Sequence, residues 1–375
     1  MRHPSSCHLR RDGALLGGFL NRKRAASLTA GSQDRSLPTA DERAIAYWLL
    51  GLCAMVFLMV VIGGVTRLTE SGLSITEWKP VVGVIPPLDE AQWQAEFEKY
   101  KQIPQYALNP SMSLGAFKSI FFWEYLHRLW GRLIGIVYLV PFLWFLVRGR
   151  IPKRLAPALA VIFVLGGMQG VLGWYMVKSG LVDRTEVSQY RLVAHLVAAV
   201  LLYLAMLWVA LGLLWPKGEN PGQKGLRRAA SGVLGLVLLT LIAGGFVAGL
   251  RAGYIYNTFP DMNGEWVPEG YARLTPWILN WFETIPAVQF NHRVLAEATW
   301  LAVAVLWFQS LKAGLSRRAR LAFHGLFGAA CLQVALGIST LLLVVPVPLA
   351  AAHQAGAILL VTAALVARHA VREGA

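Results

Sequence analysis

Hydrophobic residues in this chain occur in long continuous runs that are separated by polar segments. A run of about 20 apolar residues is long enough to cross a bilayer as a helix. Only helices and closed barrels satisfy the backbone in lipid, and runs without apolar–polar alternation favour helices. The pattern predicts an all-α polytopic membrane protein with eight transmembrane helices over residues 44–66, 121–147, 157–178, 190–214, 229–250, 288–311, 320–344 and 347–370.

Composition and charge support this prediction. Hydrophobic residues make up 56% of the chain and charged residues 15%, unlike an ordinary soluble domain. The net charge of +15 would suggest nucleic acid, but most Lys and Arg residues outside the helices lie in the terminal tails and loops on one side of the predicted membrane. This is the positive-inside pattern, so we expect cytoplasmic termini, a lipid bilayer as partner and no nucleic acid. We favour the bacterial inner membrane over the mitochondrial one.

The runs and loops predict five parts of the chain. They are a basic cytoplasmic tail, expected to be disordered (1–43), an N-terminal four-helix bundle (44–214) with a long outside loop (67–120), a cytoplasmic linker (215–228), a C-terminal four-helix bundle (229–370) and a short tail (371–375).

The outside loop of the first half contains an apolar stripe at helical spacing. The stripe consists of Leu88, Trp93, Phe97 and Tyr100. It predicts a surface helix over residues 88–100 that either caps the first bundle or anchors the loop in the membrane interface.

The second half of the chain repeats the first, weakly but in order. Four stretches match: VIGGVTRLTESG (61–72) with IAGGFVAGLRAG (242–253), EYLHR (124–128) with QFNHR (289–293), MQGVLG (168–173) with LQVALG (332–337), and VAHLVAAV (193–200) with AAHQAGAI (351–358). Each half holds four predicted helices, so both halves insert in the same orientation. We therefore expect two pseudo-symmetric four-helix bundles related by an axis along the membrane normal.

Four of the eight histidines recur at equivalent places in the two halves: His127 and His195, then His292 and His353. Each lies about one to two turns inside the outer end of its helix. The next turn of each helix carries small residues, which leave room for a flat macrocycle between two imidazoles. Histidine nitrogen is a common axial ligand of heme iron, and bundle cores are suited to such sites. The quartet predicts one heme or metal site in each half.

A membrane histidine can also form a hydrogen bond between helices or bind zinc. A lone histidine more often forms an interhelical hydrogen bond, and we expect this role for His324, which has no counterpart in the first half. Zinc is less favoured than heme because zinc needs about four tight ligands, whereas these helices offer small apolar neighbours.

The two halves differ in one chemically important residue. Glu124 and Arg128 flank His127, whereas Gln289 and Arg293 flank His292. Glutamine can form hydrogen bonds but cannot exchange a proton as a general acid or base. The difference suggests chemistry at the first site and electron transfer by a resident heme at the second. The two arginines could pair with heme propionates, and Glu124 with Arg128 could also form an ordinary i,i+4 ion pair.

At these residues the chain resembles the heme A synthases, membrane enzymes of cytochrome oxidase biogenesis. The resemblance covers roughly residues 44–370. It rests on GGVTRLTESGLSITEWKPVVGVIPPL (63–88), EYLHRLWGR (124–132), AGYIYNTFPDMNGEW (252–266), NHR (291–293) and the helices of His195 and His353.

The resemblance implies an oxidoreductase that converts a porphyrin methyl of heme O to a formyl group, giving heme A. His127 and His195 would then face the substrate heme, and His292 and His353 would ligate heme b. Glu124 falls on the essential carboxylate of the family. Some members carry a cysteine pair in the first outside loop, but residues 67–120 of this chain contain no cysteine.

The resemblance also implies partners: heme O, an electron donor, and the heme O synthase and assembly factors of cytochrome oxidase. The source of oxygen, the donor and a homo-oligomeric state are left open. Two other functions remain: a diheme b-type membrane cytochrome that only transfers electrons, and a transporter built on parallel repeats. The first gives Glu124 no special task, and the second requires a polar path through the bundles.

Overall fold

The computed structural model describes residues 37–78, 82–182, 185–215, 220 and 222–372. Within these residues the secondary structure is helical, with one isolated β-bridge between Met262 and Glu265. The predicted cytoplasmic tail, residues 1–43, lies almost wholly outside the described residues, as does the end of the C-terminal tail.

Eight helices in the described part of the chain are long and apolar enough to cross a membrane. They are α2 (Ala40–Leu68), α4 (Leu114–Val147), α5 (Ala156–Val182), α6 (Gln189–Leu214), α7 (Lys224–Gly249), α9 (Ile285–Leu311), α10 (Arg317–Leu342) and α11 (Val347–Ala370). Each overlaps one predicted span, so the all-α polytopic fold is confirmed. Some begin several residues earlier than the apolar run, because polar residues such as those at the start of α4 still extend the helix outside the lipid.

Local sequence signals set several helix starts. The Ser113 hydroxyl accepts the Ala116 N–H at the start of α4, and Ser316 does the same for Ala319 at the start of α10. Such caps satisfy N–H groups that have no partner inside the helix. Proline stands at the first turn of α9 and α11, where its missing N–H is not needed.

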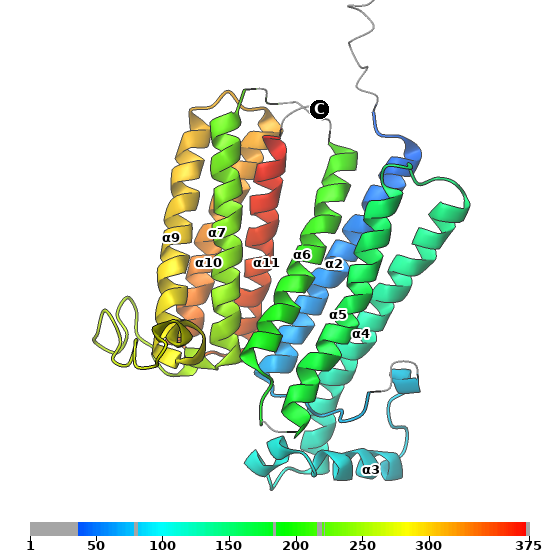
Figure 1. Ribbon diagram of the computed structural model, residues 1–375, viewed down its shortest axis with the longest axis vertical. Helices are drawn as coiled ribbons and strands as arrows, with labels where there is room; N and C mark the ends of the chain where they lie inside the picture. The colour runs from blue at the N-terminus through cyan, green and yellow to red at the C-terminus, as the bar shows by residue number, and fades with distance from the viewer. Residues whose placement is uncertain (1–36, 79–81, 183–184, 216–219, 221, 373–375) are drawn as a thin grey trace, which may run out of the picture. The chain divides into compact units, whose positions relative to one another are not determined.

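The helices form two groups of four, with α2, α4, α5 and α6 in one and α7, α9, α10 and α11 in the other (Figure 1). In the first group α2 contacts α4 and α6, and α5 contacts α4 and α6. In the second group α7 contacts α9 and α11, and α10 contacts α9 and α11. Each helix thus has the neighbours of its counterpart, which is consistent with two pseudo-symmetric bundles.

The two groups meet through α2 and α6 on one side and α7 and α11 on the other. Gly64 of α2 lies against Gln354 of α11, and the equivalent Gly245 of α7 lies against Val193 of α6. The Gln354 amide also donates to the Val60 carbonyl at 2.9 Å. Glycine at equivalent positions therefore lets the helices of the two halves approach closely.

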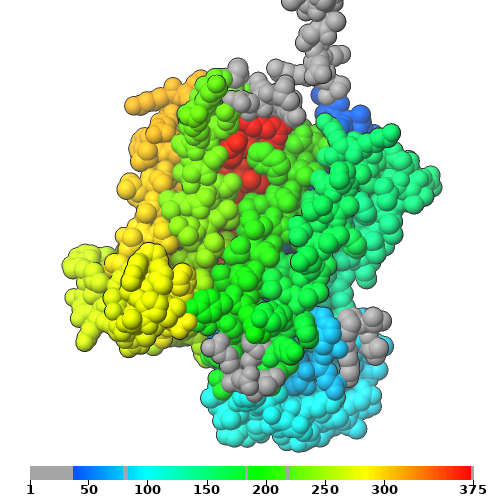
Figure 2. All heavy atoms as spheres, in the orientation of Figure 1, coloured from blue at the N-terminus to red at the C-terminus, as the bar shows by residue number. Residues whose placement is uncertain are grey.

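The long segments that follow α2 and α7 lie at the same end of the helices, with the cyan segment below the first group and the yellow segment below the second (Figure 2). In the first half, α3 (Glu90–Tyr100) packs across the start of α4. Phe97 and Tyr100 are buried against Phe117 and Phe121 of α4. The remaining short helices are η1 (Val82–Val84), η2 (Pro104–Leu108), η3 (Ala252–Tyr254), η4 (Trp277–Leu279) and α8 (Asn280–Glu283).

The apolar stripe predicted for this surface helix is right for three of its four residues. Trp93 packs against the same aromatic cluster, with its ring centroid 5.0 Å from that of Phe121. The prediction for Leu88 is wrong, because Leu88 precedes the helix and is 76% exposed. The helix begins after Asp89 because the Asp89 side chain accepts the Gln92 N–H as an N-cap.

The interface between the halves predicts a sharp difference between two glycines of α7. A Cβ added at Gly249 would lie 2.9 Å from the backbone Cα of Gln189 on α6, which cannot move easily, whereas nothing lies within 4 Å at Gly235. We expect Gly249→Ala to destabilise the protein by about 1–3 kcal/mol and Gly235→Ala to leave it unchanged or stabilise it slightly. Thermal unfolding of the purified variants measures the difference, and equal Tm values would contradict the close packing.

Candidate functional site

The four repeated histidines occupy two pairs of helices. His127 of α4 and His195 of α6 belong to the first group, and His292 of α9 and His353 of α11 belong to the second. α4 and α6 both pack on α2 and α5, and α9 and α11 both pack on α7 and α10, so each pair lies on two helices of one group. All four side chains are partly buried. The structure thus brings together the histidines that the sequence paired.

A glycine on the neighbouring helix supports each of these imidazoles. A Cβ built at Gly63 would lie 2.8 Å from Cε1 of His127, and one built at Gly244 would lie 2.9 Å from Cε1 of His292. At Gly173 the same atom would lie 3.3 Å from Cε1 of His195. At Gly337 it would lie 2.9 Å from Cε1 of His353. Any side chain there would displace the ring, so these positions fix its orientation.

The ring nitrogens are arranged differently on the two edges of each imidazole. Nδ1 of His127, His195 and His292 is buried without a hydrogen-bond partner among the described residues. Nδ1 of His353 lies 3.2 Å from Nε2 of Gln333. The Cε1 end of each ring faces its glycine. Because Nδ1 is buried in three of the rings, Nε2 is the nitrogen left to bind iron, and the residues present fit heme ligation.

Two glutamines that the sequence reasoning left without a role also contact the histidine helices. Gln169 of α5 donates to the carbonyl of His195 at 3.2 Å, and Gln333 of α10 donates to the carbonyl of His353 at 3.0 Å. The internal repeat had aligned these two glutamines, as it had aligned the four glycines. Repetition within the chain was therefore the signal that could have identified both sets.

The expected room below the histidines is only partly present. A Cβ at Gly131, one turn after His127, would lie 3.2 Å from Met59 Cε. At Gly356, one turn after His353, it would meet the Gln333 side chain. These two small residues serve helix packing, and the glycines that touch the imidazoles lie on neighbouring helices instead.

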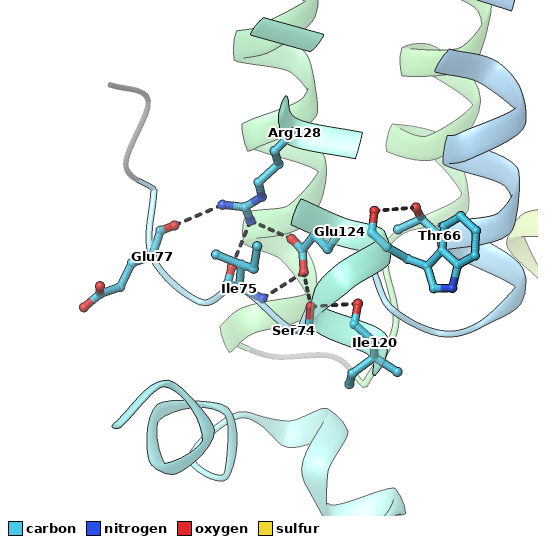
Figure 3. Close-up of polar contacts among 8 residues, drawn as sticks. Thr66, Ser74, Ile75, Glu77, Ile120, Glu124 and Arg128 are labelled. Atoms are coloured by element: carbon cyan, nitrogen blue, oxygen red, sulfur yellow. Dashed lines mark hydrogen bonds and ion pairs between the residues drawn. The ribbon is translucent and has the colours of Figure 1, made fainter. Parts of the chain in front are cut away.

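Glu124 is buried, with 3% of its surface exposed, and is bound on both oxygens (Figure 3). Oε2 accepts the Ser74 hydroxyl at 2.7 Å and the Ile75 N–H at 2.8 Å. Oε1 accepts from Arg128 at 2.6 Å, which confirms the i,i+4 ion pair. The carboxylate therefore fastens the first outside loop to α4, a role that no motif in the sequence indicated.

The second half repeats this arrangement without a carboxylate. Gln289 donates through Nε2 to the Tyr256 carbonyl at 3.0 Å, and its Oε1 is buried with no partner among the described residues. Where Glu124 accepts three hydrogen bonds, Gln289 donates one. The chemical asymmetry between the two sites is thus built into otherwise matching surroundings.

Arg128 and Arg293 bind backbone carbonyls of the outside loops. Arg128 donates to Ile75 at 2.8 Å and Glu77 at 3.0 Å. Arg293 donates to carbonyls of Tyr256, Thr258 and Asp261, each at 2.8 Å. Their contact with heme propionates stays a prediction, whereas their contact with the loops is observed.

The loop bound by Arg293 is also held by one of its own acids. The Thr258 hydroxyl and the Gly264 N–H donate to Asp261 Oδ1 at 2.7 and 2.9 Å, and both lower the pKa of Asp261. The carboxylate therefore stays charged at neutral pH and keeps the loop in the conformation that Arg293 binds.

His324 lies apart from these sites. Trp307 donates through Nε1 to Nδ1 of His324 at 2.9 Å, from α9 to α10. This interhelical hydrogen bond is the role that the sequence predicted for His324.

Fold and site together define a class: a polytopic helical membrane protein with a supported histidine pair in each half. The chain belongs to the COX15-CtaA family of cytochrome oxidase assembly proteins, whose family model matches residues 46–365. The resemblance predicted from the sequence is thereby confirmed.

Three relatives illustrate the similarity, and each is named heme A synthase. The protein of Nitrosospira multiformis is 52% identical over 337 residues, which cover 89% of this chain and 95% of the relative. That of Rhodospirillum centenum is 55% identical over 323 residues, 86% of each chain. That of Parvibaculum lavamentivorans is 53% identical over 319 residues, 85% of this chain and 91% of the relative.

The glycine supports predict the effect of one added methyl group on heme binding. In Gly244→Ala the new Cβ would lie 2.9 Å from Cε1 of His292, so the imidazole must turn away. We expect a loss of heme from the purified protein and a destabilisation of about 1–3 kcal/mol. Gly232→Ala, on the same helix with nothing within 4 Å, is the control. Equal heme content per chain in the two variants would contradict the support role.

Proposed function

We propose that this protein is a heme A synthase that oxidises a methyl group of heme O to the formyl group of heme A. The names of the relatives give the reaction class. The contrast between Glu124 and Gln289 supports the assignment of roles to the two sites. The sites have matching surroundings, but only the first contains a group that can exchange a proton. A cytochrome that only transfers electrons would not need this difference.

In this proposal His127 and His195 hold the iron of the substrate heme through Nε2. Their orientation is set by Gly63 and Gly173, which leave each ring little freedom to turn. Binding by two fixed imidazoles places the porphyrin, and hence its reacting methyl group, at a constant position relative to Glu124. Such positioning lowers the activation free energy, because the entropy cost of orienting the methyl group is met when the heme binds.

His292 and His353 would hold a resident heme b, which would supply electron transfer when bound. Gly244 and Gly337 support these rings. Gln333 contacts both Nδ1 and the carbonyl of His353, whereas Gln169 contacts only the carbonyl of His195. The firmer hold on His353 suits a heme that stays, and the looser hold on His195 suits a heme that must enter and leave.

The reaction removes four electrons from one carbon in two steps. Each step replaces a C–H bond of the methyl group by C–OH, giving first an alcohol and then a hydrated aldehyde that loses water to give the formyl group. Each step passes two electrons from the carbon to an external oxidant and moves protons near the porphyrin edge, and Glu124 accepts or stabilises these protons. The Ser74 hydroxyl, 2.7 Å from Oε2 of Glu124, is the neighbour that can pass a proton onward.

The surroundings of the reaction follow from the fold and the relatives. Eight membrane-spanning helices and bacterial relatives support a multi-pass protein of the bacterial inner membrane, with heme O as substrate. The basic loops support cytoplasmic termini, which puts both histidine pairs toward the outer surface. An electron donor, the heme O synthase and oxidase assembly factors are the partners that this chemistry calls for.

Replacing the carboxylate tests the assignment of Glu124. Glu124→Gln keeps a hydrogen-bonding side chain, and the second half already carries glutamine beside arginine at this place, so the fold is expected to persist. We expect unchanged heme b content and a fall in heme A yield of about 100-fold or more, the usual weight of a general acid or base. Pigment extraction after supply of heme O measures both quantities.

The control removes a different carboxylate that also pairs with an arginine. Glu42→Gln breaks a 2.9 Å pair with Arg154 at the opposite end of the helices and should leave the yield unchanged. A wild-type yield in Glu124→Gln would remove this residue from the mechanism. A wild-type protein that cycles electrons but converts no heme O would establish the diheme cytochrome instead.

A further inference from the structure

Four charged side chains meet where the outer ends of α2 and α7 come together. Glu186 accepts from both arginines of the cluster, with Arg67 at 2.9 Å and Arg251 at 3.2 Å. Arg251 also pairs with Glu70 at 2.5 Å. Arg67 and Glu70 belong to the first half, Glu186 to the loop before α6, and Arg251 to the end of α7. The cluster therefore joins the outer ends of the two halves.

Glu70 and Arg251 occupy equivalent positions in the internal repeat. Each follows the end of the first helix of its half, and each has a left-handed backbone, with φ of 58° and 54°. This conformation is unfavourable for residues with a Cβ, so their surroundings must hold it. The repeat thus brings two equivalent residues of opposite charge face to face across the boundary between the halves.

The loop that begins at Glu70 ends at the candidate catalytic carboxylate. The Gln105 amide donates to the Glu70 carbonyl at 3.0 Å, and Ser71 is fully buried. The Ser74 N–H then donates to the Ser71 carbonyl at 3.2 Å. Ser74 and Ile75 hold Oε2 of Glu124 (Figure 3). Six residues therefore connect an ion pair with the second half to the hydrogen bonds that orient Glu124.

We propose that Arg251 and Glu186 are positioning residues for Glu124. Arg251 holds Glu70, the first residue of the loop of residues 70–75, and Glu186 holds Arg251 and Arg67. The loop in turn fixes the carboxylate of Glu124. The proposal rests on the proposed function only where it concerns heme A yield. Single ion pairs at half-exposed positions contribute little, but Arg251 forms two and Glu186 accepts two, so removing either residue breaks a network.

Hydrogen exchange of the intact protein, followed by mass spectrometry, tests the proposal without reference to activity. In Arg251→Gln and in Glu186→Gln, we expect the amides of residues 71–77 to exchange about fivefold faster than in the wild type. Arg251→Lys keeps the charge but not the forked geometry, and should give intermediate protection. Added salt should speed exchange in the wild type more than in Arg251→Gln, because it screens half-exposed pairs.

Arg154→Gln is the matched control, because it breaks an arginine–glutamate pair of 2.9 Å at the other end of the helices. In Arg154→Gln, the amides of residues 71–77 should exchange at the wild-type rate. Wild-type exchange of residues 71–77 in both Arg251→Gln and Glu186→Gln would overturn the proposal. Faster exchange with an unchanged heme A yield would support the positioning role and count against the catalytic role of Glu124. A failure of the positioning proposal is therefore distinguishable from a failure of the proposed function.

Discussion

The close approach of a glycine backbone to the edge of each imidazole is the constraint on which the rest of this structure depends. Membrane interiors offer few polar groups to orient a histidine, and three of the four Nδ1 atoms have no partner among the described residues. Steric contact with Gly63, Gly173, Gly244 and Gly337 takes the place of hydrogen bonds. It holds each ring at its Cε1 end.

Duplication then allows one arrangement to serve two purposes. In both halves an arginine, one turn after Glu124 or Gln289, binds carbonyls of the loop that follows the first helix. In both halves a glutamine on the third helix donates to a carbonyl of the fourth helix. Against this common background, Glu124 accepts three hydrogen bonds where Gln289 donates one. In the proposed function, this exchange of carboxylate for amide is what separates the site of chemistry from the site of electron transfer.

The sequence predicted the features that depend on composition and repetition. The eight spans followed from hydrophobicity, and the pairing of His127 with His195 and of His292 with His353 followed from the repeat. It could not predict which glycine contacts which ring, since that depends on how neighbouring helices are rotated. Leu88 was misplaced because the cap at Asp89, not the apolar stripe, decides where α3 begins. The loop contacts of Glu124 required a fold that brings Ser74 and Ile75 to α4.

A high-resolution structure of the protein purified after supply of heme O tests the central claim most directly. The account predicts two porphyrin irons, one between Nε2 of His127 and His195 and the other between Nε2 of His292 and His353. The Cε1 end of each ring should remain against its glycine. Porphyrin bound elsewhere, or histidines within a half that turn away from one another to bond across helices, would contradict it.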